Sequence, residues 1–122
     1  MQILIRMLIM GYESSFNYEF YDAEIKNLDE LNKKVSKLEY GMGDAKITKS
    51  SYDGLHSITY SIEMDTYSGK FYDDEDFAEL VSKYLAKGYL DLIFTGEDGT
   101  IGGFRAYPKK VKHLEAKFAE ID

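Results

Sequence analysis

The sequence predicts an α+β protein with a mainly antiparallel sheet and helices on one face of that sheet. Three observations support this prediction. Several segments alternate apolar and polar residues with the period of two that half-buried strands show. Other segments repeat apolar residues every three or four positions, as amphipathic helices do. Two Asp-Gly pairs, Asp53-Gly54 and Asp98-Gly99, separate neighbouring strand segments and suit the tight turns of hairpins.

The N-terminal part of the chain contributes two predicted strands. The apolar run Ile3 to Met10 has one wholly apolar face, which suits a central strand of a sheet covered on one side. It carries Arg6, lacks a basic leader and is far shorter than a membrane span, so we expect neither a signal peptide nor a membrane anchor. Residues Phe16 to Tyr21 alternate as a second strand, and Gly11 to Ser15 form the hairpin loop between the two.

The first predicted helix begins after Asn27. The side chain of Asn27 offers a cap oxygen, and Glu30 follows three residues later as in a capping box. Gly41 and Gly43 supply the left-handed geometry that ends such a helix. The apolar side chains that share one face of the helix are Leu28, Leu31, Val35 and Leu38.

A hairpin and a second helix follow. Strands from Ala45 to Ser51 and from Leu55 to Met64 pair about the first Asp-Gly turn. The second helix is capped by Asp73 or Asp74 and stops at Gly88. Its apolar stripe consists of Phe77, Leu80, Val81, Tyr84 and Leu85.

The C-terminal part is predicted as two strands and a helix. Strands Tyr89 to Thr95 and Thr100 to Tyr107 pair about the second Asp-Gly turn, and nearby glycines indicate a bulge in the later strand. That later strand is also a candidate exposed edge through which a homodimer could form. Pro108 is tolerated in a first helical turn, and helical spacing then predicts a C-terminal helix. The residues with that spacing are Val111, Leu114, Phe118 and Ile121.

The two halves of the chain look duplicated. FYDAEIKNLDEL from Phe20 matches FYDDEDFAEL from Phe71, which indicates a candidate repeat over about residues 3–51 and 55–95, with coincidence as the alternative. The element order strand, helix, strand, given twice, resembles the ferredoxin-like fold, βαββαβ. The resemblance covers roughly Ile3 to Thr95 and requires an inserted hairpin arm and an extra C-terminal strand and helix. Many functions use this fold, so it implies none.

Composition limits the classes of function. A chain of 122 residues with 44% apolar content suits one domain spanning 1–122, and its one proline leaves no linker. The absence of cysteine removes disulfides and thiolate metal sites and fits a cytoplasmic location. The net charge of −7 argues against direct binding of nucleic acid, which needs clustered Lys and Arg.

No residue pattern predicts an enzyme, a metal or a cofactor. A calcium loop starting at Asp65 is excluded because Tyr67 and Gly69 stand at ligand positions. The glycines match neither the dinucleotide fingerprint nor the P-loop. His56 and His113 lack the spacing of a helical zinc site, and no nucleophile and base converge.

The strongest candidate for a binding surface is the acidic stretch at the start of the second helix. Four consecutive acids, Asp73 to Asp76, exceed what one helix cap requires, although capping alone remains the alternative explanation. Carboxylates attract a basic protein, and tyrosines supply rigid contact area. We therefore expect a non-enzymatic protein-binding domain with a basic partner. The candidate partner-binding residues are Asp65, Tyr67, Tyr72, Asp73, Asp74, Glu75, Asp76 and Glu79.

In size, acidity and lack of a catalytic motif the chain resembles small phage or mobile-element inhibitors, including anti-CRISPR proteins that mimic nucleic acid. The resemblance implies a cytoplasmic inhibitor that blocks a basic nucleic-acid-binding defence protein. Two alternatives stay open. One is an immunity protein that neutralises a toxin by the same electrostatic means. The other is a small anion-binding enzyme or sensor that uses the open sheet face. Arg6 is the candidate anion-binding residue there, with a structural ion pair to a neighbouring carboxylate as the alternative.

Overall fold

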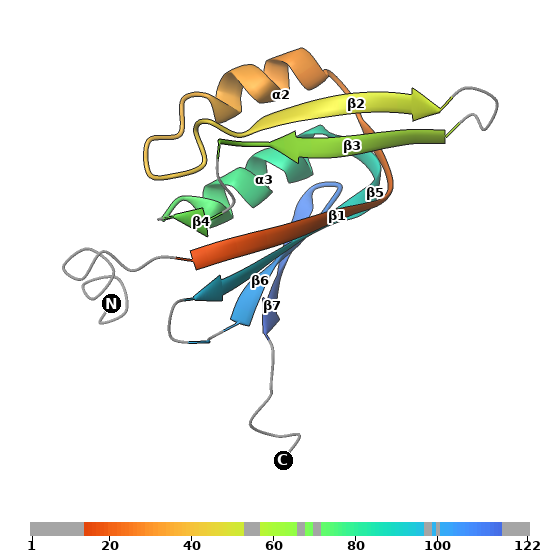
Figure 1. The fold of residues 1–122 in the computed structure, drawn as a ribbon. Helices are drawn as coiled ribbons and strands as arrows, with labels where there is room; N and C mark the ends of the chain where they lie inside the picture. The colour runs from red at the N-terminus through yellow and green to blue at the C-terminus, as the bar shows by residue number, and fades with distance from the viewer. Residues whose placement is uncertain are drawn as a thin grey trace.

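A computed structural model describes residues 14–52, 57–65, 68–69, 72–96, 99 and 101–115. These residues form two antiparallel sheets and two helices, which confirms the predicted α+β class (Figure 1). The larger sheet has the strand order β4-β1-β5-β6-β7, and β2 pairs with β3 as a separate hairpin. The elements are β1 Ser14–Ile25, α2 Leu28–Val35, β2 Lys46–Tyr52, β3 Ser57–Glu63, β4 Ser68–Gly69, α3 Asp74–Tyr84, β5 Leu85–Gly96, β6 Ile101–Tyr107 and β7 Lys110–Glu115.

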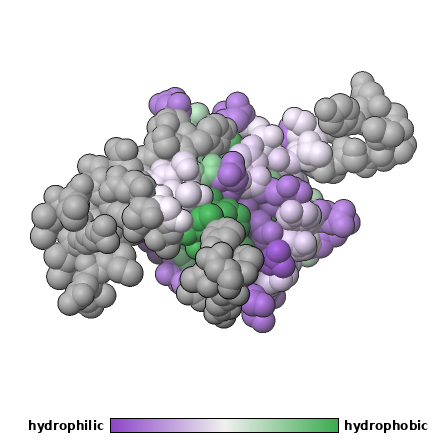
Figure 2. Space-filling view, turned by 60° about the horizontal axis from the view of Figure 1, so that its bottom comes forward, coloured by the Kyte–Doolittle hydropathy of each residue, from purple (hydrophilic) through white to green (hydrophobic). Residues whose placement is uncertain are grey.

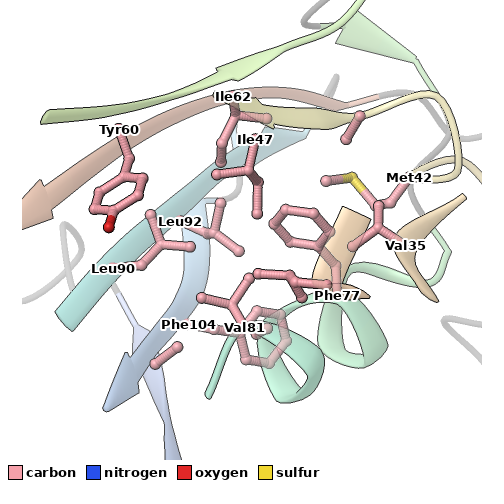
Figure 3. Close-up of a cluster of buried hydrophobic side chains, with 14 of the residues drawn as sticks. Val35, Met42, Ile47, Tyr60, Ile62, Phe77, Val81, Leu90, Leu92 and Phe104 are labelled. Atoms are coloured by element: carbon pink, nitrogen blue, oxygen red, sulfur yellow. The ribbon is translucent and has the colours of Figure 1, made fainter. Parts of the chain in front are cut away.

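The hydrophobic core lies between one face of the larger sheet, the β2-β3 hairpin and the two helices. Helix α3 packs on β5, β6 and β7, while α2 packs on α3 and β2. In Figure 3, Ile47 and Ile62 of the hairpin point toward Leu92 of β5, and Phe77 of α3 lies across from them. All four side chains are fully buried, so apolar burial holds the two sheets together. Neither helix in the described ranges is long and apolar enough to cross a membrane.

The start of α2 confirms the capping prediction. The Asn27 side-chain oxygen accepts a hydrogen bond from the backbone N–H of Glu30 at 3.2 Å, and the Asn27 amide donates to the Glu30 carboxylate at 3.4 Å. The predicted end is wrong, because the helix stops at Val35 and not at the glycines. Gly41, at φ 135°, instead lies in the following loop.

The prediction that Gly88 ends the second helix is also wrong. Helix α3 ends at Tyr84, and β5 begins at the next residue without a loop. Gly88 lies inside β5 at φ 76°, opposite the irregular pairing that follows Tyr21 in β1. A Cβ atom at Gly88 would lie 2.4 Å from the carbonyl oxygens of Tyr21 and Asp22, so the glycine permits a close approach of two strands.

The predicted C-terminal helix is wrong over the described residues, which form β7 instead. Pro108 and Lys109 make a turn, with Lys109 at φ 64°, and β7 pairs antiparallel with β6. Val111 and Leu114 have helical spacing, but in a strand they point to opposite faces, and each side chain is half-buried here. Phe118 and Ile121 lie outside the described residues.

The element order βαββαβ is present once the two-residue strand β4 is set aside. It starts at β1, however, which contains the residues Phe16 to Tyr21 that the sequence predicted as the inserted arm. Its first and last strands, β1 and β5, pair antiparallel, while β2 and β3 stay outside the larger sheet. The predicted exposed edge at 100–107 is wrong, because β6 lies between β5 and β7. The predicted bulge in this strand is also wrong, since β6 keeps a regular register with β5. Gly99, at φ 86°, donates its N–H to the Gly96 carbonyl and confirms the second tight turn.

Four further predictions are not decided by the fold. The strand predicted at Ile3 to Met10 and the turn at Asp53-Gly54 lie outside the described residues. The internal repeat and the single domain over 1–122 stay predictions.

Candidate functional site

Asp73 does not belong to an exposed acidic surface. It is only 2% exposed, and its carboxylate turns away from helix α3. One carboxylate oxygen accepts the backbone N–H of Tyr40 and the other accepts that of Met42, each at 2.9 Å. The prediction that Asp73 is displayed to a partner is therefore wrong. Asp73 stands at the N-cap position but caps no helix N–H; it ties the loop between α2 and β2 to the start of α3.

The same junction places two tyrosines near the start of α3. The N–H of Tyr72 donates to the Tyr40 carbonyl at 2.9 Å, and the Tyr72 side chain is half-buried. Tyr40 is 61% exposed and was not among the predicted site residues. Its sequence position carries no signal, because only the hydrogen bonds to residues 72 and 73 bring it to this surface.

Four acids on α3 remain accessible, and we call them the acidic ridge: Asp74, Glu75, Asp76 and Glu79. The Asp74 carboxylate is half-buried and accepts the Glu75 N–H at 2.8 Å. Burial raises the pKa of Asp74 to about 6, and the neighbouring charges of Asp73 and Glu75 add to this rise, while the hydrogen bond from Glu75 opposes it. The other three ridge residues are exposed.

Lysines flank the acidic ridge on both sides. Between α2 and α3 a shallow groove of about 300 Å³ is lined by Lys34, Lys37 and Lys83 together with Asp76 and Glu79. Between α3 and the turn before β7 a second groove of about 440 Å³ has a similar mixture of charges. Its charged lining residues are Glu75, Glu79, Lys83, Lys109 and Lys110.

Contacts with these lysines do not neutralise the ridge. Glu75 pairs with His113 of β7, with 3.3 Å between the carboxylate oxygen and Nε2. Among the described residues, no Lys, Arg or His nitrogen lies within 4.0 Å of the carboxylates of Asp74, Asp76 or Glu79. The ridge therefore carries carboxylates that no cation of the described ranges pairs, within a surface of mixed charge.

Of the remaining predicted site residues, the structure describes Asp65, and it does not join the ridge. Asp65 is exposed in the segment after β3, and no described contact links it to α3. Tyr67 lies outside the described residues. Within the described ranges, no three His, Asp or Glu side chains gather in a way that could hold a metal ion.

The face of the larger sheet opposite α3 carries a second cluster. Arg105 of β6 binds Asp91 of β5 through two hydrogen bonds, 2.6 and 2.9 Å long. Its guanidinium also lies 4.5 Å from the centre of the Tyr89 ring, which stacks on Tyr21 at 4.7 Å. Arg105 is thus occupied by a carboxylate of its own chain. Arg6, the predicted anion-binding residue of this face, lies outside the described residues.

The chain matches no protein-family model, no curated protein and no solved structure.

Proposed function

We propose that this chain is a non-enzymatic protein-binding domain that uses the acidic ridge to bind a basic protein. The observation that carries the proposal is the environment of Asp74. Its half-buried carboxylate has a pKa raised to about 6, and no cation of the described residues contacts it. A Lys or Arg brought to this position by a partner would offset both the desolvation and the like-charge repulsion, so it would bind favourably.

The surroundings of the ridge suit a protein partner. Tyr40 stands exposed at the same end of α3 and offers a rigid aromatic surface with a hydroxyl group. The flanking lysines, such as Lys34 and Lys83, repel a basic partner from positions beside the ridge and so favour one docking position. A narrow acidic strip bordered by lysines fits a basic helix or loop of a partner better than it fits a broad, flat basic surface.

A phage or mobile-element inhibitor that occupies the nucleic-acid groove of a defence protein is the specific form of the proposal. Its support is the net charge of −7 together with the ridge carboxylates that no cation in the described part of the chain pairs. An immunity protein that neutralises a basic toxin would use the same ridge. The neighbouring gene separates the two, since an immunity protein is expected beside its toxin.

The first experiment compares affinity capture by two variants that have the same net charge. The ridge variant is Glu75→Gln, Asp76→Asn and Glu79→Gln. The control variant is Asp22→Asn, Glu24→Gln and Glu63→Gln, three exposed acids of β1 and β3. At low salt we expect the wild type and the control variant to retain a basic protein that the ridge variant loses.

High salt should release that protein from the wild type, because salt screens exposed charges. Equal capture by the ridge variant and the control variant would place the contact elsewhere and refute the proposal. Purified partner identified in this way is then used to measure affinity directly.

The second experiment uses the titration of Asp74. A cation bound beside Asp74 lowers its pKa, so the affinity should increase as the pH rises from 5 to 7 and binding should release a proton. Asp74→Asn should remove this part of the pH dependence. Calorimetry in two buffers of different ionisation enthalpy measures the proton release. Identical release by the wild type and Asp74→Asn would contradict a cation at this site.

A further inference from the structure

The face of the larger sheet that α3 does not cover presents side chains in regular rows across the strands. We call it the open face. Paired residues of neighbouring strands point to the same side, so the registers of β1, β5, β6 and β7 define each row. One row consists of Asn17, Ile93, Gly103 and Leu114; the next consists of Glu19, Asp91, Arg105 and Lys112. A third row contains Tyr21 and Tyr89, whose rings stack, then Tyr107, whose ring is tilted against that of Tyr89, and ends at Lys110.

The open face combines apolar and aromatic area with charge. Ile93 and Leu114 are half-buried although no described helix or hairpin packs on this side. Figure 2, viewed from the side of β6 and β7, shows an apolar area open to view next to a hydrophilic one. Tyrosine and arginine are the residues that most often dominate the binding energy of protein interfaces, and Tyr89 and Arg105 lie at the centre of this face.

The charges of the open face change sign from one edge of the sheet to the other. The β1 side is negative through Glu19 and Asp91, and the β7 side is positive through Arg105, Lys110 and Lys112. The three rows therefore hold two acids against three bases, whereas the whole chain has a net charge of −7. Of the surfaces described, the open face is therefore the one through which two copies of this acidic chain can come together without placing charges of the same sign opposite each other.

We propose that the open face binds a second copy of this chain about a two-fold axis parallel to the strands. Such an axis reverses each row and places it against itself. Glu19 then faces Lys112 of the second copy, and Asp91 faces Arg105 of the second copy, twice in the dimer. The tyrosine row contacts the tyrosine row of the second copy, and the apolar row likewise contacts its equivalent. These contacts on either side of the charged row exclude water from it. A two-fold axis across the strands would instead oppose like charges.

Charge reversal tests this geometry. Glu19 and Lys112 are both exposed, so reversing either should leave the fold intact. In the dimer, Glu19→Lys would place a lysine opposite Lys112 of the second copy, and Lys112→Glu would place a glutamate opposite Glu19 of the second copy. We expect each single variant to raise the dimer dissociation constant at least about tenfold in sedimentation equilibrium over micromolar to millimolar concentrations.

Two combinations should restore association. The double variant Glu19→Lys/Lys112→Glu again places opposite charges together and should dimerise within about threefold of the wild type. An equimolar mixture of the two single variants should form mixed dimers for the same reason. Glu79→Lys, which makes the same charge change on the acidic ridge, should leave the dissociation constant unchanged.

Three results would overturn the proposal. The first is a wild type that stays monomeric at millimolar concentration, including one whose open face is covered by its own residues 1–13. The second is an association that neither single variant weakens. The third is a double variant that remains as weak as the single ones. The proposal stands independently of partner binding, because the ridge variant leaves the open face intact and the open-face variants leave the ridge intact.

Discussion

Removing the Asp73 carboxylate should destabilise the protein far more than removing any acid of the exposed ridge. Asp73→Ala deletes two hydrogen bonds of 2.9 Å from the backbone N–H groups of Tyr40 and Met42. Met42 is fully buried, so its N–H loses its partner without access to water, while the N–H of Tyr40 is only partly buried. The loss at Met42 is costly, while water partly compensates the loss at Tyr40. Together the two losses should destabilise the protein by about 2–4 kcal/mol.

The conservative substitution separates the acceptor role from the loss of side-chain volume. Asp73→Asn keeps one acceptor oxygen, which can still bind the Met42 N–H, and its amide group can turn toward the partly exposed position of Tyr40. We expect it to cost about 1–2 kcal/mol. Asp76→Ala, on the exposed side of the same helix, is the matched control and should cost less than about 1 kcal/mol.

Urea unfolding measures these differences as shifts of the midpoint at constant slope. Asp73→Ala should also lower Tm by several degrees and speed hydrogen exchange at Met42, because the loop between α2 and β2 loses its link to α3. If Asp73→Ala proves no more destabilising than Asp76→Ala, or if the Met42 amide keeps its protection, the structural role assigned to Asp73 is incorrect.

Two further predictions concern stability. A Cβ atom at Gly103 would lie 1.8 Å from the Leu92 carbonyl oxygen, so Gly103→Ala should destabilise the protein by more than about 2 kcal/mol. A Cβ atom at Gly99 would meet no atom within 4 Å, so Gly99→Ala should cost only about 1 kcal/mol, because of the positive φ at this position. Urea unfolding of the two variants compares these free energies. Because the pKa of Asp74 is raised to about 6 in the folded state, the folded state binds this proton more tightly and stability should fall as the pH rises from about 4 to about 6. Asp74→Asn should abolish that fall and be more stable than the wild type at pH 7 by about 1 kcal/mol, after allowing for the partial exposure of the carboxylate. Unfolding curves measured at several pH values test this. A parallel decline in the stability of both proteins would contradict the reasoning.

Local signals in the sequence predicted local structure well. The cap at Asn27 and the apolar stripe through Phe77 and Val81 identified both helices, since these patterns act within a few residues. Helix ends were harder to predict. Gly88 looks like a helix stop, but its positive φ serves the close approach of β5 to β1 at their irregular pairing, and that pairing joins residues far apart in the chain.

In the candidate site, too, local patterns were predicted from the sequence, whereas features that depend on long-range contacts were not. The four consecutive acids read alike in the sequence, yet Asp73 turns inward because residues 40 and 42 bring it two N–H groups. Tyr40 reaches the ridge through those contacts alone. The charged row of the open face follows from the registers of four strands, and no single segment contains its pattern. Long-range contacts of this kind have no local signature.

The titration of the Asp74 carboxyl carbon by NMR is the most direct test of an uncompensated acidic ridge. In the free protein its resonance should shift with a midpoint near pH 6, because burial and the charges of Asp73 and Glu75 disfavour the ionised form. Addition of the captured basic partner should move the midpoint to lower pH. A midpoint near the ordinary value of an aspartate, about 3.9, or one that the partner leaves in place, would contradict binding of a cation at the ridge.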